Sequence, residues 1–481
     1  MPNTNTPLSR RGFFSHAGSG VYGAALAWLL NRDLVNGSGL LAAESTGHDL
    51  RPRQAHFQPQ ATSVIQLFMQ GGPSQMDLFD PKPKLDELHG RSYFEQVAAD
   101  LTGPEDAGAL MRSPFKFRHH GESGIPVSEL LPHTSRVVDD IAVIRSMFTT
   151  HFNHEPAIFK YQSGRLIQGL PSIGSWIVYG LGSENQNLPA YVALSHPSGK
   201  LPVNGVQNWQ AGLLPPIYQG TQFRSSGSPL LNLRREVEQP PNVLQYERDL
   251  LNRLDRIHRN KRPGQLQLDA RLASYQLAAR MQVEATDALD LAQETAATHK
   301  MYGLDQPKTG NFGRRCLIAR RLIERGVRFI QICTERQIWD NHSKLVSGLA
   351  DCCRRTDQPV AGLLKDLKQR GMLDSTLILW GGEFGRMPIA QLHSSTVGRD
   401  HNPRGFTVWL AGGGVKGGTI YGSTDELGYQ AEANPVSVTD LHATILHLLG
   451  LYHDELVFDH NGLEEKLTSV FKAKIVRDIL A

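Results

Sequence analysis

The sequence predicts an α/β protein whose central sheet is mostly parallel. Short apolar runs rich in β-forming residues alternate with longer stretches that have apolar residues at helical spacing. This alternation is typical of a parallel sheet covered by helices on both faces. The chain is large enough for such a fold, because 481 residues with 40% hydrophobic and 20% charged residues can build an extensive core.

Five apolar runs predict the strands of this sheet. Each is short and bounded by glycine or by polar turn residues, as a buried strand is. The runs lie at residues 64–69, 139–145, 326–332, 373–380 and 406–411.

The stretches between these runs predict helices. Residues 314–325, 345–370 and 438–449 are amphipathic, and Thr439 or Asp440 can cap the start of the last one. Residues 241–300 have apolar positions three and four apart with an excess of Ala, Leu, Gln and Glu, which predicts a helical hairpin or insertion. We therefore expect a single domain over 63–481 with a helical insertion at about 235–305.

The first 45 residues have the form of an export leader. A twin arginine at positions 10 and 11 precedes two aromatic residues, and the apolar stretch GVYGAALAWLL follows. This pattern indicates the twin-arginine route and a periplasmic or extracellular location. Cleavage near residue 43, an uncleaved anchor, and a chance arginine pair before a buried helix are the open alternatives. Residues 46–62 are polar and are expected to form a linker.

Charge and cysteine content exclude several classes of protein. Lys+Arg 50 against Asp+Glu 47 gives a net charge of +3, far from the basic excess of a dedicated nucleic-acid binder. Four cysteines without a CxxC pair exclude a disulfide-built scaffold and a structural zinc ribbon. Beyond the N-terminal region no apolar run reaches about 18 residues, so the remaining chain is not expected to span a membrane.

Polar residues gather next to the predicted strands. Ligands of open parallel sheets bind outside the carboxyl ends of the strands, so these residues are expected on one rim. The rim residues are Gln70, Ser74 and Asp77; His151, Asn153, His154 and Glu155; Trp339, Asp340, Asn341 and His342; Glu383 and Arg386; and Arg399, Asp400, His401 and Asn402.

Imidazole and carboxylate groups together suit a divalent metal such as zinc, manganese or calcium. For any one histidine alone, a surface or hydrogen-bonding role is the alternative. Arg386 and Arg399 flank the rim and could hold a phosphate, sulfate or carboxylate, or form surface salt bridges. No P-loop, GxSxG or HExxH motif is present.

Several segments resemble the domain-of-unknown-function 1501 family (DUF1501). They are FMQGGPSQMDLFDPKP at 68–83, HFNHEP at 151–156, PSIGSWIVYGLGSENQNLPAYV at 171–192, WDNH at 339–342, GGEFGRMP at 381–388, GRDHNPRGFTVWLAGGGVKGG at 398–418 and DLHATILHLLGL at 440–451. The resemblance covers nearly the whole chain after the leader. It implies an exported bacterial protein of planctomycete type. It also implies an alkaline-phosphatase-like or sulfatase-like three-layer sandwich with a metal-dependent site at the strand ends.

When the metal ligands of the superfamily are matched to positions of this sequence, the resemblance implies only part of a two-metal site. Asp340, His342 and His401 match the ligands of the first metal. Glu383 can supply an oxygen to the second metal, whereas Gln70 and Phe384 stand where the superfamily has ligands.

In place of the usual Ser, Thr or modified Cys nucleophile, the chain has Asn153-His154-Glu155. The resemblance therefore leaves His154 as a nucleophile, a ligand or a base. Asp77 is a further acidic candidate for a metal ligand.

Two functions are expected. The first is a metal-dependent hydrolase of phosphate or sulfate esters, including anionic esters on polysaccharides. Its metal would be held by Asp340, His342, His401 and Glu383; His154 would attack or accept a proton, and Arg386 or Arg399 would hold the anion. The second is a catalytically inactive metal- or glycan-binding component of an extracytoplasmic assembly, which Gln70 and Phe384 favour.

Overall fold

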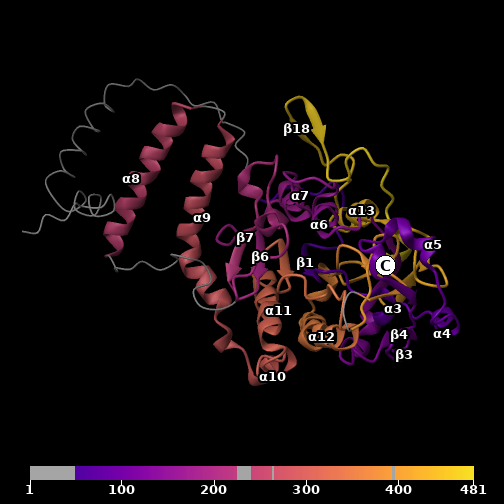
Figure 1. The fold of residues 1–481 in the computed structure, drawn as a ribbon. Coiled ribbons are helices and arrows are strands. Elements are labelled where there is room, and N and C mark those ends of the chain that lie inside the picture. Colours follow the sequence, from indigo (N-terminus) through magenta and orange to yellow (C-terminus); the bar gives the residue numbers. More distant parts are fainter. Residues whose placement is uncertain (1–48, 225–239, 263–264, 393–395) are drawn as a thin grey trace, which may run out of the picture. The chain divides into compact units, whose positions relative to one another are not determined.

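The computed structural model describes residues 49–224, 240–262, 265–392 and 396–481 (Figure 1). The predicted leader, residues 1–45, and the first residues of the predicted linker lie outside these ranges. None of the helices within the described ranges is both long and apolar enough to cross a membrane.

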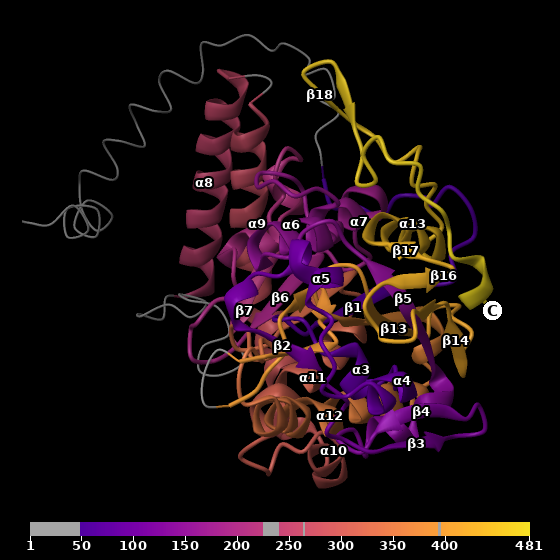
Figure 2. The ribbon, with the colours of Figure 1, turned by 45° about the vertical axis from the view of Figure 1, so that its right-hand side comes forward.

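A nine-stranded sheet forms the centre of the fold (Figures 1 and 2). Its order is β14(Thr419–Tyr421), β5(Ile141–Phe148), β13(Phe406–Ala411), β9(Thr376–Gly381), β1(Ser63–Phe68), β8(Phe329–Cys333), β6(Tyr191–Ser195) and β7(Thr221–Arg224), with β17(Val436–Ser437) also paired to β5. Every pairing is parallel except the two that β13 makes with β5 and β9. The predicted α/β class with a mostly parallel central sheet is confirmed.

All five predicted strands are present, as β1, β5, β8, β9 and β13. The strands β6, β7, β14 and β17 were not predicted. The direction of β13 matters for the site. Because β13 is antiparallel to its neighbours, the residues that precede it lie at the same sheet edge as the residues that follow β1, β5, β8 and β9.

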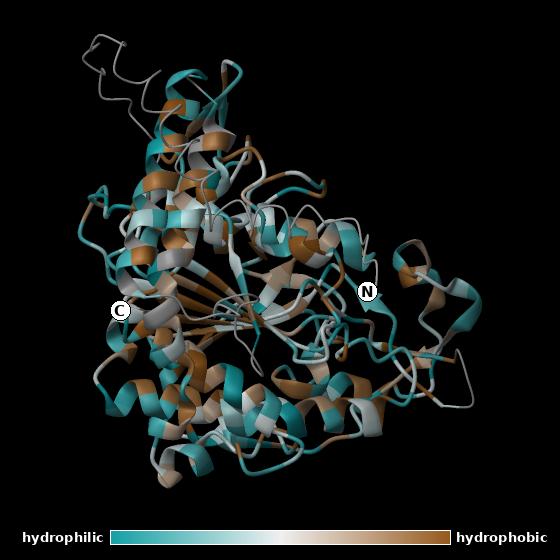
Figure 3. Ribbon diagram, turned by 90° about the vertical axis from the view of Figure 1, so that its left-hand side faces the viewer, coloured by the Kyte–Doolittle hydropathy of each residue, from teal (hydrophilic) through white to brown (hydrophobic). Residues whose placement is uncertain are grey.

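Helices cover both faces of the sheet, which makes a three-layer sandwich. Along β1, Ile65 and Leu67 face the core that contains α11(Gly310–Ile323) and α12(Leu345–Gln369). The alternate residues Val64 and Phe68 face the core that contains α6(His154–Ser163), α7(Ile173–Leu181) and α13(Val438–Leu448). Figure 3 shows the result, with hydrophobic strands at the centre between helices of mixed polarity.

The predicted helices at 314–325, 345–370 and 438–449 correspond to α11, α12 and α13. The start of α13 differs from the prediction. Ser437 is the N-cap, and its hydroxyl and the Asp440 carboxylate satisfy each other's backbone N–H groups in a capping box. Asp440 is thus the third helical residue rather than the cap.

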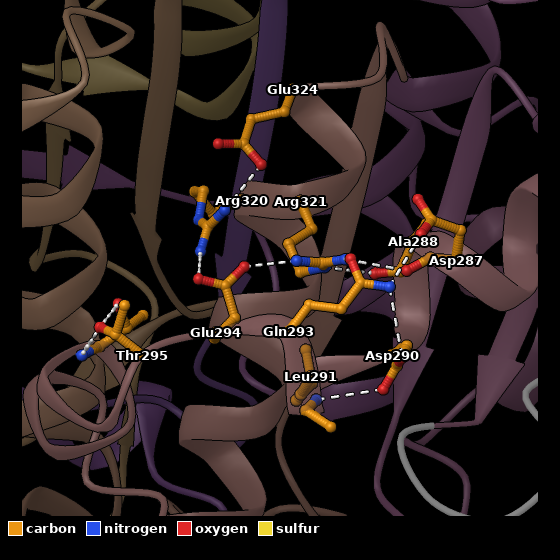
Figure 4. Close-up of polar contacts among 12 residues, drawn as sticks. Asp287, Ala288, Asp290, Leu291, Gln293, Glu294, Thr295, Arg320, Arg321 and Glu324 are labelled. Carbon is orange, nitrogen blue, oxygen red and sulfur yellow. Dashed lines mark hydrogen bonds and ion pairs between the residues drawn. The ribbon is translucent and has the colours of Figure 1, made fainter.

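Two long helices, α8(Pro241–Asn260) and α9(Leu266–Leu289), lie side by side in the region for which a helical insertion is predicted (Figures 1 and 2). The chain after α9 is tied to α11 by buried ion pairs (Figure 4). Glu294 pairs with Arg320 at 2.7 Å and also with Arg321, whose guanidinium bonds to the carbonyl of Ala288 at 2.9 Å.

Shorter elements lie in the connections. They are α3(Gln75–Leu78), α4(Pro83–Glu87), α5(Phe94–Val97), α10(Ala296–Met301), β2(Ala107–Leu110), β3(Phe117–His120), β4(Ile125–Ser128), β10(Gly385–Arg386), β11(Ile389–Gln391), β12(His401–Asn402), β15(Ser423–Thr424), β16(Ala431–Ala433), β18(Phe458–His460) and β19(Leu463–Glu465).

Candidate metal centre

Three separate segments bring four candidate ligands together at the carboxyl edge of the sheet. His154 is the first residue of α6, Asp340 and His342 follow β8, and His401 is in β12, just before β13. One ligand atom from each of the four lies within 4.8 Å of the others. We refer to these four residues as the metal cluster.

The same nitrogen of each imidazole, Nε2, faces the Asp340 carboxylate. Oδ1 of Asp340 lies 3.0 Å from Nε2 of His342 and 3.2 Å from Nε2 of His401, and Oδ2 lies 3.3 Å from Nε2 of His154. The Nε2 atoms of His342 and His401 are only 2.8 Å apart. Two nitrogen lone pairs at that distance repel unless a proton or a cation lies between them.

The opposite nitrogen, Nδ1, is hydrogen-bonded in two of the three histidines. Nδ1 of His154 lies 2.6 Å from Oε1 of Glu383, and Nδ1 of His342 lies 2.6 Å from Oε1 of Gln391. An acceptor at Nδ1 holds the proton on that nitrogen and leaves the Nε2 lone pair free, which is the arrangement around most metal-bound imidazoles.

Two buried nitrogens of the metal cluster lack a hydrogen-bond partner among the described residues, namely Nε2 of His154 and Nδ1 of His401. The first is the nitrogen that faces Asp340. A buried imidazole nitrogen without a donor or acceptor is costly, and a cation at the centre of the cluster would satisfy it. The donor set and this orphaned nitrogen therefore fit a divalent metal.

The pKa shifts indicate a charge distribution that attracts a cation. Burial opposes ionisation of Asp340, but Arg386 and the three neighbouring imidazoles outweigh it and hold the pKa of this carboxyl below its usual range. Burial, aided by the charges of Arg386 and His154, lowers the pKa of His401 to about 3. For His154, burial lowers the pKa, but the nearby carboxylates of Asp340 and Glu383 outweigh it and raise the pKa.

Arg386 holds the Asp340 carboxylate in position. Its side chain is 1% exposed, and Nη2 donates to Oδ1 of Asp340 at 2.7 Å. The other donors reach the carbonyls of Gly71, of Gly72 at 2.9 Å and of Arg399 at 3.1 Å. Because these partners occupy the guanidinium, the expectation that Arg386 holds a substrate anion does not fit its position.

Asp77 and Arg399 form a fully buried ion pair away from the metal cluster. Nε of Arg399 lies 2.7 Å from Oδ2 of Asp77, Nη2 lies 3.2 Å from Oδ1, and neither side chain is exposed. The structure therefore does not bring Asp77 to the metal cluster as a ligand, and it does not offer Arg399 to an anion. Both residues had been expected at the rim because sequence cannot distinguish a buried pair from two exposed charges.

Glu383 supports His154 instead of joining the four clustered ligands. Its side chain is fully buried, and its Oε1 accepts hydrogen bonds from Nδ1 of His154 and from the backbone N–H of Gly71, the latter at 3.0 Å. The neighbouring Phe384 packs against the rings of His154 and His401, with centroid distances of 4.8 and 4.5 Å. An aromatic ring, which cannot bind a metal ion, thus covers one side of the cluster.

Gly71 allows the loop after β1 to approach the loop after β8. Its φ is +114°, and a Cβ atom at this position would lie 2.5 Å from the backbone nitrogen of Asp340. A side chain here would be strained and would push Asp340 away.

Sequence reasoning missed one residue that orients the metal cluster. Gln391, whose amide oxygen accepts from His342, lies in β11 within no recognisable motif. Asp400 was expected at the rim; it accepts from the backbone N–H of Thr102 and of His401, each at 2.8 Å, and so anchors the segment that carries His401.

Together these features define an α/β protein with a candidate metal centre of three imidazoles and one carboxylate at the carboxyl edge of its sheet. The chain belongs to the family described as Protein of unknown function (DUF1501), whose model matches residues 61–480. The resemblance to this family noted from the sequence segments is confirmed.

No curated protein matches this chain. Among solved structures, it is similar to an alkaline phosphatase from the Antarctic bacterium TAB5, with 10% identity over 81% of this chain and 98% of that chain and a TM-score of 0.35. A sulfatase from Pseudoalteromonas sp. is 12% identical over 90% of this chain and 72% of that chain, with a TM-score of 0.34. A phosphonate monoester hydrolase from Silicibacter pomeroyi is 12% identical over 88% of this chain and 76% of that chain, with a TM-score of 0.31. Similarity at this level carries no argument about the activity of this chain.

Proposed function

We propose that this protein is a metal-dependent hydrolase of phosphate or sulfate esters. The observation that carries the proposal is the convergence of four ligand atoms from His154, Asp340, His342 and His401 within 4.8 Å. A divalent metal there supplies Lewis-acid activation of an ester oxygen and a lowered pKa for water. The cluster is reachable by substrate, because the side chains of Asp340 and His342 are 22% and 27% exposed.

In this proposal the residues of the chain divide into ligands and supports. The Nε2 atoms of the three histidines and the carboxylate of Asp340 bind the metal. Glu383 and Gln391 keep the Nε2 lone pairs of His154 and His342 free, and Arg386 keeps the Asp340 carboxylate ionised and oriented. His154 is assigned as a ligand rather than a nucleophile, because its Nε2 faces the other three ligands.

Coordination number separates this function from a second candidate, a catalytically inactive metal-binding component. Four protein ligands fill the tetrahedral coordination sphere of a zinc ion in a structural site. Manganese and calcium bind more ligands than four, so coordination positions remain for water and substrate. The second candidate is favoured by the two arginines, because the guanidinium groups of Arg386 and Arg399 are already occupied by carboxylates and carbonyls.

We further propose that the protein is exported by the twin-arginine route and acts on anionic esters of polysaccharides. The export proposal is supported by the arginine pair and the apolar stretch that follows it in the sequence. The partial exposure of Asp340 and His342 supports access by a polymer. The mass of the protein recovered outside the cytoplasm would identify the mature N-terminus.

The experiment is elemental analysis of the purified protein and of His401→Ala, with His453→Ala as the control because His453 lies outside the metal cluster. We expect at least one divalent metal per chain in the wild type and in the control, and its loss in His401→Ala. Each protein is then loaded with manganese or zinc and tested on aryl phosphate and aryl sulfate esters. Turnover with manganese supports the hydrolase, tight zinc without turnover supports the binding component, and the absence of metal from the wild type would overturn both.

A further inference from the structure

A second polar cavity lies at the carboxyl edge of the sheet, between α11 and α12. Its volume is about 310 Å³. Residues after β6 and β8 form one side, including His196 and Glu335, while α11 and α12 contribute Arg315 and Arg355. None of its lining residues belongs to the metal cluster. We refer to it as the α11–α12 cavity.

Arg315 lines this cavity as a buried cation. The residue is 2% exposed, and its guanidinium stacks on the ring of Phe312 at 5.1 Å. Its Nε donates to the carbonyl of Asn311 at 3.3 Å, and Nη1 donates to the carbonyl of Cys333. Within the described part of the chain, no carboxylate forms an ion pair with this guanidinium. A buried charge is normally paired, because an unpaired charge in the interior loses its hydration without compensation.

Neighbouring cations are more numerous than the carboxylates that could balance Arg315. Glu335 lies 3.4 Å from Lys200 and 3.7 Å from Arg355. Asp351 pairs with Lys308 at 2.7 Å and with Arg355 at 2.6 Å. Asp351 also lies 3.7 Å from Arg354, so the two carboxylates are shared among four other cations. Glu335 still attracts Arg315 through space, but it forms no ion pair with this guanidinium.

The pKa shifts agree with this geometry. Burial lowers the pKa of the Arg315 guanidinium to about 10, so it is still charged at neutral pH. Burial, with Arg315 as the next cause, lowers the pKa of His196 and keeps this imidazole neutral.

We infer that the α11–α12 cavity is an anion-binding site, in which Arg315 pairs with a phosphate, sulfate or carboxylate group. A guanidinium fixed by two carbonyls presents its remaining N–H groups in a rigid fork, which matches an oxyanion. The volume is equivalent to about ten water molecules, at roughly 30 Å³ each. It therefore accommodates the anion either free or attached to a small organic group such as one sugar. The inference does not depend on the proposed hydrolase activity.

Calorimetric titration of the full chain, freed of metal with a chelator, tests the inference. The probes are inorganic phosphate and inorganic sulfate, with chloride at equal ionic strength as the reference. We expect saturable binding that is about tenfold or more weaker in Arg315→Met. Arg328→Met is the matched control, because Arg328 is also buried and donates to backbone carbonyls, but it does not line the cavity. Binding that is equal in the wild type and Arg315→Met, or no binding beyond that of chloride, would overturn the inference.

A second variant guards against misfolding of Arg315→Met. Arg355→Gln changes a side chain that is 35% exposed and also lines the cavity, so the fold should tolerate it. We expect it to weaken anion binding several-fold, and unchanged affinity in a folded Arg355→Gln would count against the site. A final titration with glucose 6-phosphate identifies the source of the anion. Tighter binding than inorganic phosphate indicates a sugar-borne group, and equal or weaker binding indicates a free anion.

Discussion

At the scale of single residues, the geometry of the metal cluster depends on groups outside the four candidate ligands. Glu383 fixes the ring of His154 through Nδ1, and Gln391 does the same for His342. These contacts decide which nitrogen carries the proton, and therefore which nitrogen can bind a cation. The oxygen atoms of Glu383 are fully buried, so their charge acts on His154 with little screening by water.

Glu383→Gln should weaken metal binding about 10- to 100-fold, because the neutral amide polarises His154 less and places an N–H group where one acceptor oxygen was. Metal affinity measured by competition with a chelator checks this. Glu432→Gln, at an exposed position, is the control and should leave the affinity unchanged. Equal affinity in Glu383→Gln and the wild type would show that His154 is not a ligand.

Gly71→Ala should also reduce metal binding, by a steric route. Its Cβ would lie 2.5 Å from the backbone nitrogen of Asp340, which must move and take its carboxylate with it. Gly90→Ala is a matched control, because Gly90 also has a positive φ of +83° but no atom lies within 4 Å of its added Cβ. Both variants should lose stability through backbone strain, about 1 kcal/mol or more. Only Gly71→Ala should lose metal in elemental analysis, and retention of metal there would contradict the loop geometry.

At the scale of elements, ion pairs join the chain after α9 to α11. Glu294 binds Arg320, which is 1% exposed, and also binds Arg321 (Figure 4). Burial opposes ionisation of Glu294, but the two guanidinium groups outweigh it and lower the pKa of this carboxyl. Without the Glu294 carboxylate, Arg320 keeps Glu324 and Asp366, whereas Arg321 keeps only carbonyl and amide acceptors and loses its carboxylate partner.

Glu294→Gln should therefore lower the free energy of unfolding by about 1.5–3 kcal/mol, the range for hydrogen bonds to a charged group. Urea denaturation monitored by circular dichroism measures this difference. Asp351→Asn provides the comparison, since Asp351 pairs with Lys308, whose side chain is 60% exposed, and such pairs contribute about 0–1 kcal/mol. Similar losses in the two variants would show that burial does not strengthen the Glu294 contacts.

His442 connects α13 to α6 and makes the stability of this contact depend on pH. Its Nε2 lies 2.9 Å from the carbonyl of Tyr161, and burial lowers the pKa of the imidazole from 6.5 to about 4. The unfolded chain therefore binds a proton between about pH 6.5 and pH 4 that the folded chain does not. The contribution of neutral His442 to the free energy of unfolding is therefore complete above about pH 6.5, and it is lost as the pH falls toward 4.

Protonation of His442 should lower the free energy of unfolding by about 3 kcal/mol, because each unit of pKa difference between the folded and unfolded chains contributes about 1.36 kcal/mol. Unfolding free energies measured by urea between pH 7 and pH 4 check it. In His442→Gln the amide can still donate to Tyr161, and the decline with falling pH should be shallower by that amount. An unchanged decline would mean that His442 does not control it.

The sequence predicted the strands that are covered by helices on both faces of the sheet. β1, β8, β9 and β13 are mostly apolar and buried along their whole length, because helices cover both sides of the sheet. Strands such as β14 and β17 have three and two residues, and their pairing with β5 depends on tertiary contacts that a local pattern does not contain.

Position relative to these strands also predicted that Asp340, His342 and His401 lie at one edge of the sheet, and the structure places them together there. Burial of the charged residues could not be predicted in the same way. Arg386 is buried because carbonyls from several distant loops surround it, and Arg399 is buried because it meets Asp77, which lies 322 residues away in sequence. Contacts of that range leave no periodic signal in the chain.

At the scale of the whole molecule, a metal in the cluster would tie together three segments that are far apart in sequence, at His154, at Asp340 with His342, and at His401. A ligand that binds only the folded chain stabilises it by RT ln(1 + [L]/Kd), which is about 2.7 kcal/mol at a concentration of 100 Kd. For a domain of this size that corresponds to a rise in Tm of about 3 °C, since the entropy of unfolding grows with chain length.

Scanning calorimetry with excess manganese or zinc, and then with a chelator, measures this rise. We expect a metal-dependent increase in Tm in the wild type that the chelator reverses. In His401→Ala the increase should vanish, because one of the four ligands is missing and the metal no longer joins β12 to α6 and to the loop after β8. An equal increase in His401→Ala would mean that the metal stabilises the fold from another site, and the assignment of the metal cluster would then be wrong.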